Sequence, residues 1–194
     1  MKKLFFIFFL CALFIGCASN NVSSEGGFIT EYDEVRGVTS TIHEDLQAGM
    51  IYNIRDNLAG EREHVMLVIQ DSRLGLGVLY QYRNWAFLTK VVFIANGQRM
   101  EIKLDNRQTS IVTPTVVREG YSVYLSDAEA EKLRALLTVD SCGVAFIGDK
   151  YTTDKIEIKP KIRAALLATI ERYNTTKENN LRAEWPQEVG AVKR

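Results

Sequence analysis

Hydrophobic and polar side chains alternate with a period of two over much of the chain between residue 28 and about residue 125. Such alternation is typical of strands that bury one face. Short polar or glycine-containing turns separate the alternating runs, and two further runs follow later in the chain. The predicted strands are residues 28–32, 38–42, 50–55, 64–70, 75–82, 90–95, 98–104, 110–117, 121–125, 143–147 and 155–158.

The clearest local signal lies in residues 90–104, where two alternating runs flank the dipeptide Asn96-Gly97. Asn-Gly favours a two-residue type I′ turn, because that turn needs positive φ at both central positions. This turn predicts one apolar face of the hairpin, formed by the pairs Phe93–Met100 and Val91–Ile102. Val92 and Ile94 point to the other face, which we expect to be partly covered.

Two helices are predicted after most of the strands. The Ser126-x-x-Glu129 spacing matches a capping box, and the helix that it begins continues through Leu137. Pro160 begins the second helix, since proline is favoured at the first helical position. The apolar residues of this helix recur at helical spacing, in a stripe made of Ile162, Ala165, Leu166, Ile170 and Tyr173.

This order of elements predicts an α+β domain with one antiparallel sheet and two helices packed on one of its faces. We expect the domain to span residues 28–174. Pro114 cannot donate to a central ladder, so residues 110–117 should lie at an edge or contain a bulge. Residues 175–194 are polar apart from Trp185-Pro186, and we expect a loosely ordered tail there.

The first sixteen residues differ in character from the rest of the chain. Lys2 and Lys3 precede an apolar run that extends from Leu4 to Ile15. Twelve helical residues span about 18 Å, whereas a bilayer core is about 30 Å thick. The run is therefore too short to cross a membrane, but it suits the apolar region of an export signal. Residues 17–27, rich in Ser, Asn and Gly, predict a flexible tether.

The segment Phe14-Ile15-Gly16-Cys17 resembles the lipobox of bacterial lipoproteins, with Phe14 in place of the usual Leu. The resemblance implies that residues 1–16 are a signal peptide removed by signal peptidase II, and that Cys17 receives a diacylglycerol. The family usually adds a fatty acid to the new amine, and two or more acyl chains anchor a protein firmly. The alternative is an ordinary secretory signal with an incidental cysteine.

Lipid anchoring would place the domain on the periplasmic or extracellular face of a membrane. Ala18 stands where many inner-membrane lipoproteins have Asp, so the resemblance favours the outer membrane in a cell that has one. The body, residues 28–174, is also similar to a loosely defined group of uncharacterised exported bacterial domains. That likeness rests on residues 33–39, the hairpin and the helix at Ser126, and it implies no activity.

Charge and cysteine content narrow the classes of partner. The chain has 24 Lys and Arg against 24 Asp and Glu. This balance excludes the basic footprint of nucleic-acid-binding proteins, and there is no polybasic cluster for lipid headgroups. Cys11 leaves with the signal and Cys17 takes lipid, so Cys142 is left without a disulfide partner. We expect Cys142 to be a small buried residue; the alternative is a reactive or intermolecular thiol.

Candidates for catalysis and metal binding are few. His43 and His64 are the only histidines, and they do not form a His-x-x-x-His pair. A metal site needs several convergent ligands, so we expect two solvated histidines and neither metal nor other cofactor. No Gly-x-Ser-x-Gly segment is present. The alternative is a periplasmic hydrolase in which one histidine acts as the base of a triad assembled in space.

One aromatic group, made of Tyr80, Tyr82, Trp85 and Phe87, is the candidate binding patch. Tyr80 and Tyr82 share a strand face, and Trp85 follows beside Arg83. Tyr, Trp and Arg dominate binding energy at protein interfaces, although core packing would explain the same residues. We therefore predict a non-enzymatic binding or envelope-scaffold protein. Lipid on Cys17 would attach it to a membrane, and Tyr80, Tyr82, Arg83 and Trp85 would contact an envelope protein.

Overall fold

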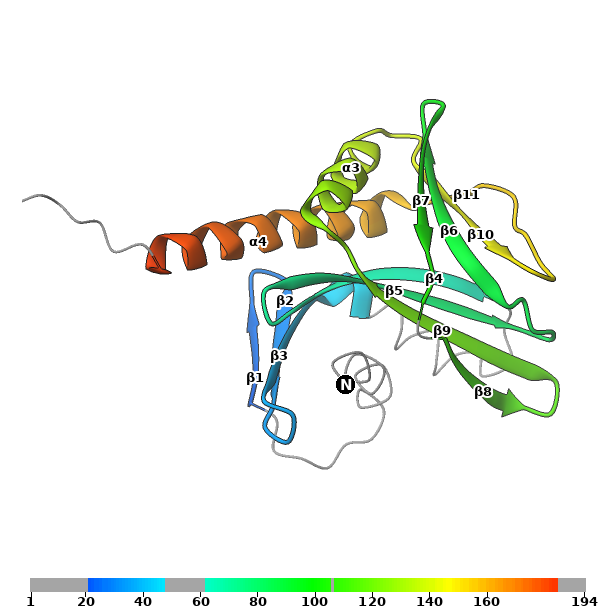
Figure 1. The fold of residues 1–194 in the computed structure, drawn as a ribbon, viewed down its shortest axis with the longest axis horizontal. Coiled ribbons are helices and arrows are strands. Elements are labelled where there is room, and N and C mark those ends of the chain that lie inside the picture. Colours follow the sequence, from blue (N-terminus) through cyan, green and yellow to red (C-terminus); the bar gives the residue numbers. More distant parts are fainter. Residues whose placement is uncertain (1–20, 48–61, 106, 185–194) are drawn as a thin grey trace, which may run out of the picture.

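A computed structural model describes residues 21–47, 62–105 and 107–184. This part of the chain is rich in strands, which form two antiparallel sheets (Figure 1). The larger sheet has the order β1-β2-β3-β4-β5-β9-β8. Its strands are β1 (Asn21–Glu25), β2 (Phe28–Asp33), β3 (Val38–His43), β4 (Arg62–Gln70), β5 (Arg73–Tyr82), β8 (Gln108–Thr113) and β9 (Val116–Tyr124).

The smaller sheet and both long helices lie on one side of the larger sheet (Figure 1). Helix α4 packs along β3, β4 and β5, whereas α3 packs against β6, β7 and α4. The smaller sheet has the order β11-β10-β6-β7. These elements are β6 (Leu88–Ala95), β7 (Gln98–Lys103), β10 (Gly143–Gly148), β11 (Ile156–Glu157), α3 (Asp127–Leu137) and α4 (Pro160–Glu184).

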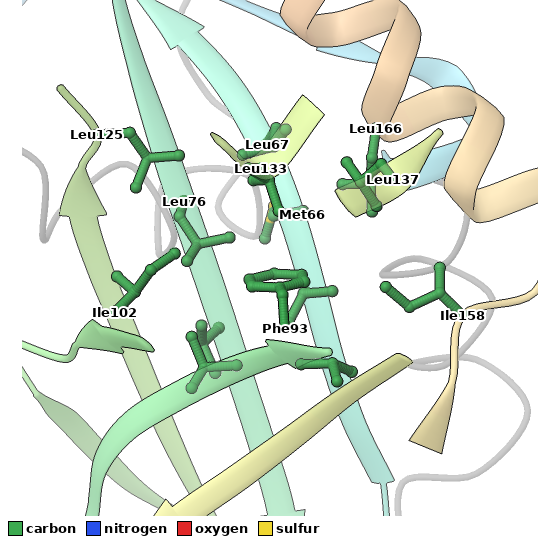
Figure 2. Close-up of a cluster of buried hydrophobic side chains, with 14 of the residues drawn as sticks. Met66, Leu67, Leu76, Phe93, Ile102, Leu125, Leu133, Leu137, Ile158 and Leu166 are labelled. Atoms are coloured by element: carbon green, nitrogen blue, oxygen red, sulfur yellow. The ribbon is translucent and has the colours of Figure 1, made fainter. Parts of the chain in front are cut away.

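The main core fills the space between the two sheets and the helices. Figure 2 shows Phe93 of β6 facing Leu67 and Leu76 of the larger sheet, with Leu133 of α3 and Leu166 of α4 nearby. All five side chains are at most 1% exposed. Full burial of such a side chain stabilises the fold by about 1.5–3 kcal/mol. The layers are therefore held together mainly by apolar contacts between elements that are distant in sequence.

The predicted hairpin is confirmed, because β6 and β7 pair with Phe93 opposite Met100 and Val91 opposite Ile102. Asn96 and Gly97 both have positive φ, as a type I′ turn requires. The second face is covered in part, because Val92 is buried. It lies opposite Ala145 of β10 in the smaller sheet.

The helix starts follow the sequence, but one helix ends later than predicted. Ser126 and Glu129 form the predicted capping box at the start of α3. Helix α4 begins at Pro160 as predicted and continues through Glu184, so the first part of the predicted polar tail is helical. Within the described residues, no helix combines the length and hydrophobicity needed to cross a bilayer.

Other expectations were wrong in part. The prediction of a single sheet was wrong, because β6, β7, β10 and β11 form a sheet of their own. Part of the predicted tether pairs with β2 as the strand β1. Residues 110–117 belong to two strands joined at Pro114 rather than to one, but the predicted edge position is confirmed, because β8 is the edge strand of the larger sheet. The strand predicted over residues 50–55, the signal peptide and Cys17 lie outside the described residues.

Candidate functional site

One buried carboxylate, on the neighbouring strand β9, holds the loop between β5 and β6. Glu119 of β9 is 0% exposed. Its Oε1 accepts hydrogen bonds from the amides of Ala86 (2.6 Å) and Phe87 (2.9 Å), and its Oε2 accepts one from the amide of Leu88 (3.1 Å). The Tyr121 hydroxyl also donates to Oε2. Four donors thus compensate the burial of this charge, since hydrogen bonds to ionised groups are stronger than neutral ones.

This carboxylate supports an unusual backbone conformation. Phe87 has φ of 53°, in the left-handed region that a bulky side chain rarely adopts. Such a conformation costs on the order of 1–3 kcal/mol and persists only where the surroundings enforce it. The hydrogen bonds to Glu119 supply that constraint. They fix the direction in which the Phe87 ring, and Trp85 two residues earlier, project from the loop.

The loop is also held from the other side, by the start of the β10–β11 connection. The amides of Asp149 and Lys150 donate to the carbonyls of Phe87 and Ala86, each at 3.1 Å. Gly148 allows this close approach, because a Cβ there would lie 2.4 Å from the Ala86 carbonyl oxygen. The β5–β6 loop therefore has few degrees of freedom left.

Half-buried Trp85 and two exposed cations surround the half-buried ring of Phe87. Trp85 lies 6.4 Å from it, centroid to centroid. The Arg107 guanidinium lies 4.9 Å from the ring centroid and the Lys150 ammonium 4.8 Å. The connections that carry Phe87 and Lys150 lie at one end of the molecule (Figure 1). We call this group the aromatic–cationic surface; its members are Trp85, Phe87, Arg107 and Lys150.

A stack of three tyrosines lies next to this surface. Tyr80 and Tyr82 are stacked at 4.5 Å, and the ring of Tyr151 lies 5.5 Å from each. The Tyr82 hydroxyl donates to Glu63. Burial, together with the hydrogen bond and the charge of Glu63, raises the pKa of Tyr82. Tyr82 therefore remains neutral, and Tyr151 is the exposed end of the stack.

The predicted patch is only partly at the surface. Tyr80 is 2% exposed, so it belongs to the core, and Tyr82 is half-buried beside it. Arg83 is exposed and Trp85 is half-buried on the loop. The sequence pattern did not identify Arg107, Lys150 and Tyr151, which come from distant segments. No local signal could have found them, because only the folded chain places Arg107 and Lys150 beside Phe87 and Tyr151 beside Tyr82.

The prediction that both histidines are solvated was wrong. His64 Nε2 is buried and has no hydrogen-bond partner. Burial lowers the pKa of His64 to about 4, and a hydrogen bond to the Leu46 backbone opposes this shift. His43 packs edge-on against Phe28 at 5.0 Å, and its Nδ1 accepts from the Asp45 amide at 3.2 Å. In the described part of the chain, no serine or cysteine forms a hydrogen bond with either ring.

Cys142 is free and buried, as predicted. Burial raises the pKa of its thiol, although Lys155 and Arg163 lie close enough to oppose the shift. A raised thiol pKa disfavours the reactive thiolate. Among the residues that the structure describes, no group of three or more His, Cys, Asp or Glu side chains could hold a metal ion.

Comparison with known proteins adds no relative. The chain matches no protein-family model. It also matches no curated protein and no solved structure.

Proposed function

We propose that this protein is a lipid-anchored protein of the bacterial envelope whose aromatic–cationic surface binds an acidic envelope protein. The lipobox-like segment that ends at Cys17 supports the anchor. The observation that carries the binding proposal is the convergence of Arg107 and Lys150 on the ring of Phe87. A non-enzymatic binding role needs only such a surface.

Electrostatics favours an acidic partner. Neither Arg107 nor Lys150 forms a salt bridge with another described residue, although both lie within 5 Å of the same ring centroid. Both cations are exposed, so a carboxylate of a partner that approaches this ring can pair with either of them. Cation–π contacts with Phe87 keep both heads near the ring and contribute about 0.5–1 kcal/mol each at an exposed site.

Rigidity of the loop favours binding as well. Association loses free energy when loops and side chains must be ordered at the interface. Here Glu119 and the β10–β11 connection already order the backbone of the β5–β6 loop. Trp85 and Phe87 are therefore presented with little further ordering, and aromatic side chains of this kind are typical anchors of interfaces.

The binding proposal is tested by crosslinking in cells, followed by detergent extraction of the full-length protein and mass spectrometry. The test variant is Arg107→Gln/Lys150→Gln. The control is Lys132→Gln/Arg134→Gln, which removes two exposed charges from α3. We expect the test variant to lower recovery of an acidic partner about tenfold, equivalent to 1.4 kcal/mol, and the control to leave it unchanged. Equal recovery with both variants would contradict the proposal.

The anchor is tested separately by growing cells with a radioactive fatty acid. The native chain should take up label and sediment with membranes, whereas Cys17→Ala should do neither. Label retained by the Cys17→Ala protein would exclude this site of lipidation. Because the domain is unchanged, the result is independent of the crosslinking experiment.

A further inference from the structure

A polar groove lies between α4 and the larger sheet, beside the turn that joins β4 to β5. Its volume is about 450 Å³, within the range of about 300–1,000 Å³ found for small-molecule sites. The β4–β5 turn is at the Arg73 end of β5, whereas the aromatic–cationic surface is beyond the Tyr82 end. At about 3.3 Å per residue, the length of β5 separates the two regions by roughly 30 Å.

Threonines form the sheet wall of the groove. Thr30 of β2 and Thr41 of β3 lie opposite each other in the ladder, with their hydroxyl oxygens 2.9 Å apart. Thr39 shares their face and also lines the groove. Asp71, in the β4–β5 turn, accepts the Thr39 amide through Oδ1 at 3.0 Å. The sheet wall thus offers several hydroxyls that can donate and accept hydrogen bonds, with Ile69 as an apolar contact.

The opposite wall comes from the part of α4 where its apolar stripe ends. Arg172, Thr176 and Asn180 are four residues apart, so they follow one face of the helix. Arg172 and Thr176 line the groove. The Asn180 amide nitrogen donates to the Ser72 hydroxyl at 2.9 Å and links α4 to the β4–β5 turn. This wall exists because α4 continues past the predicted domain boundary.

The groove contains hydrogen-bonding capacity that the described residues do not use. Arg172 forms an exposed ion pair with Glu25 at 3.7 Å, and its guanidinium lies 5.7 Å from the centroid of the Phe28 ring. The guanidinium forms no hydrogen bond with another described residue, so its N–H donors are available to a ligand. No described residue donates to the second carboxylate oxygen of Asp71. The groove is open to solvent, and polar walls from a helix and a sheet face each other across it.

We propose that this groove binds a sugar acid, a small ring with several hydroxyls and one carboxylate. The ligand carboxylate would accept two hydrogen bonds from Arg172, a geometry that guanidinium groups favour. The ligand hydroxyls would exchange hydrogen bonds with the threonines and donate to Asp71. One face of the ring would rest on Ile69. The site is distinct from the aromatic–cationic surface, and either proposal can fail without the other.

The test is saturation-transfer NMR on the detergent-solubilised full-length protein, titrated with D-glucuronate and, separately, with D-glucose. We expect glucuronate to bind with a Kd of about 1 mM and glucose about tenfold more weakly. The variant Arg172→Gln should abolish the preference for the acid. Because Arg172 is exposed, the variant should unfold at the same temperature as the native protein, which shows that its fold is intact.

Adjacent threonines provide a matched pair of variants. Thr175 and Thr176 each donate to the carbonyl four residues earlier, at 3.0 and 2.9 Å, but only Thr176 lines the groove. Thr176→Val should weaken glucuronate binding about fivefold, the value of one hydrogen bond, and Thr175→Val should not weaken it. Absence of saturable glucuronate binding, equal binding of glucose, or equal effects of the two valines would each overturn the proposal. Arg107→Gln/Lys150→Gln should bind glucuronate normally.

Discussion

Replacement of Glu119 by Gln tests whether one buried carboxylate holds the β5–β6 loop. The substitution keeps the size of the side chain but changes one acceptor oxygen into an NH₂ donor. The remaining oxygen can still accept from Ala86 and Phe87, which share Oε1 in the native protein. The new NH₂ group would face the amide of Leu88, which is a donor as well. That amide therefore loses its acceptor.

The expected cost follows from these contacts. A buried N–H without a partner costs about 1–3 kcal/mol. The two remaining bonds become neutral, and hydrogen bonds to charged groups are worth roughly 1 kcal/mol more than neutral ones. Tyr121 can rotate its hydroxyl to accept from the new NH₂ group, and the amide needs less desolvation than the carboxylate, so part of the loss is recovered. We expect the free energy of unfolding to fall by about 3 kcal/mol.

Urea unfolding followed by circular dichroism measures this change. The chain has two tryptophans, at positions 85 and 185, so a Trp185→Phe background leaves Trp85 as the fluorescent reporter of the loop. Glu119→Gln should also shift native Trp85 emission to longer wavelength, because the loop loosens. The control is Glu131→Gln. Glu131 is an exposed carboxylate that accepts hydrogen bonds from Arg134 and Asn174, and its replacement should change the free energy of unfolding by less than about 0.5 kcal/mol. A loss below about 1 kcal/mol for Glu119→Gln would refute the proposed role.

Three further outcomes are expected. In urea unfolding, Phe87→Gly should be about 1 kcal/mol more stable than Phe87→Ala, because glycine adopts positive φ without strain. Equal free energies of unfolding would show that the backbone is not strained. Because His64 has a folded-state pKa of about 4 against 6.5 for an unperturbed histidine, the unfolded chain binds its proton first, and stability should fall as the pH drops from about 6.5 towards 4. The loss in free energy of unfolding should approach roughly 3 kcal/mol. Urea titrations of His64→Asn should show no such loss between about pH 6.5 and 4.5. If stability depends on pH as steeply in this variant as in the native protein, another group causes the effect. Ser126→Ala should lower thermal stability by about 1 kcal/mol through loss of the helix cap, and no change in calorimetry would contradict that role.

Several local features were predictable because their causes lie within a few residues. The β6–β7 hairpin depends on the φ preferences of Asn96 and Gly97, and its register then follows. The start of α3 depends on hydrogen bonds between Ser126 and Glu129. The start of α4 depends on the fixed φ of Pro160. Alternation with period two correctly identified most strands, because burial of one face needs no knowledge of the partner.

The division into two sheets was not predictable in the same way. Alternation shows which side chains of a strand are buried, but not which strand pairs with it. β10 pairs with β6, and β9 pairs with β5, across long stretches of chain. The length of α4 was also missed, because its apolar stripe ends near Tyr173. The helix extends beyond that point with polar residues, of which Asn180 contacts the β4–β5 turn.

The sequence by itself determined the local turns and caps, the strand-rich character of the domain and the aromatic content of the β5–β6 segment. Only the tertiary structure placed Tyr80 in the core, Glu119 under the loop and Arg107 and Lys150 at the ring of Phe87. The physical reason is range. Backbone preferences and capping bonds act between near neighbours, whereas a binding surface depends on contacts between side chains that only long-range packing brings together.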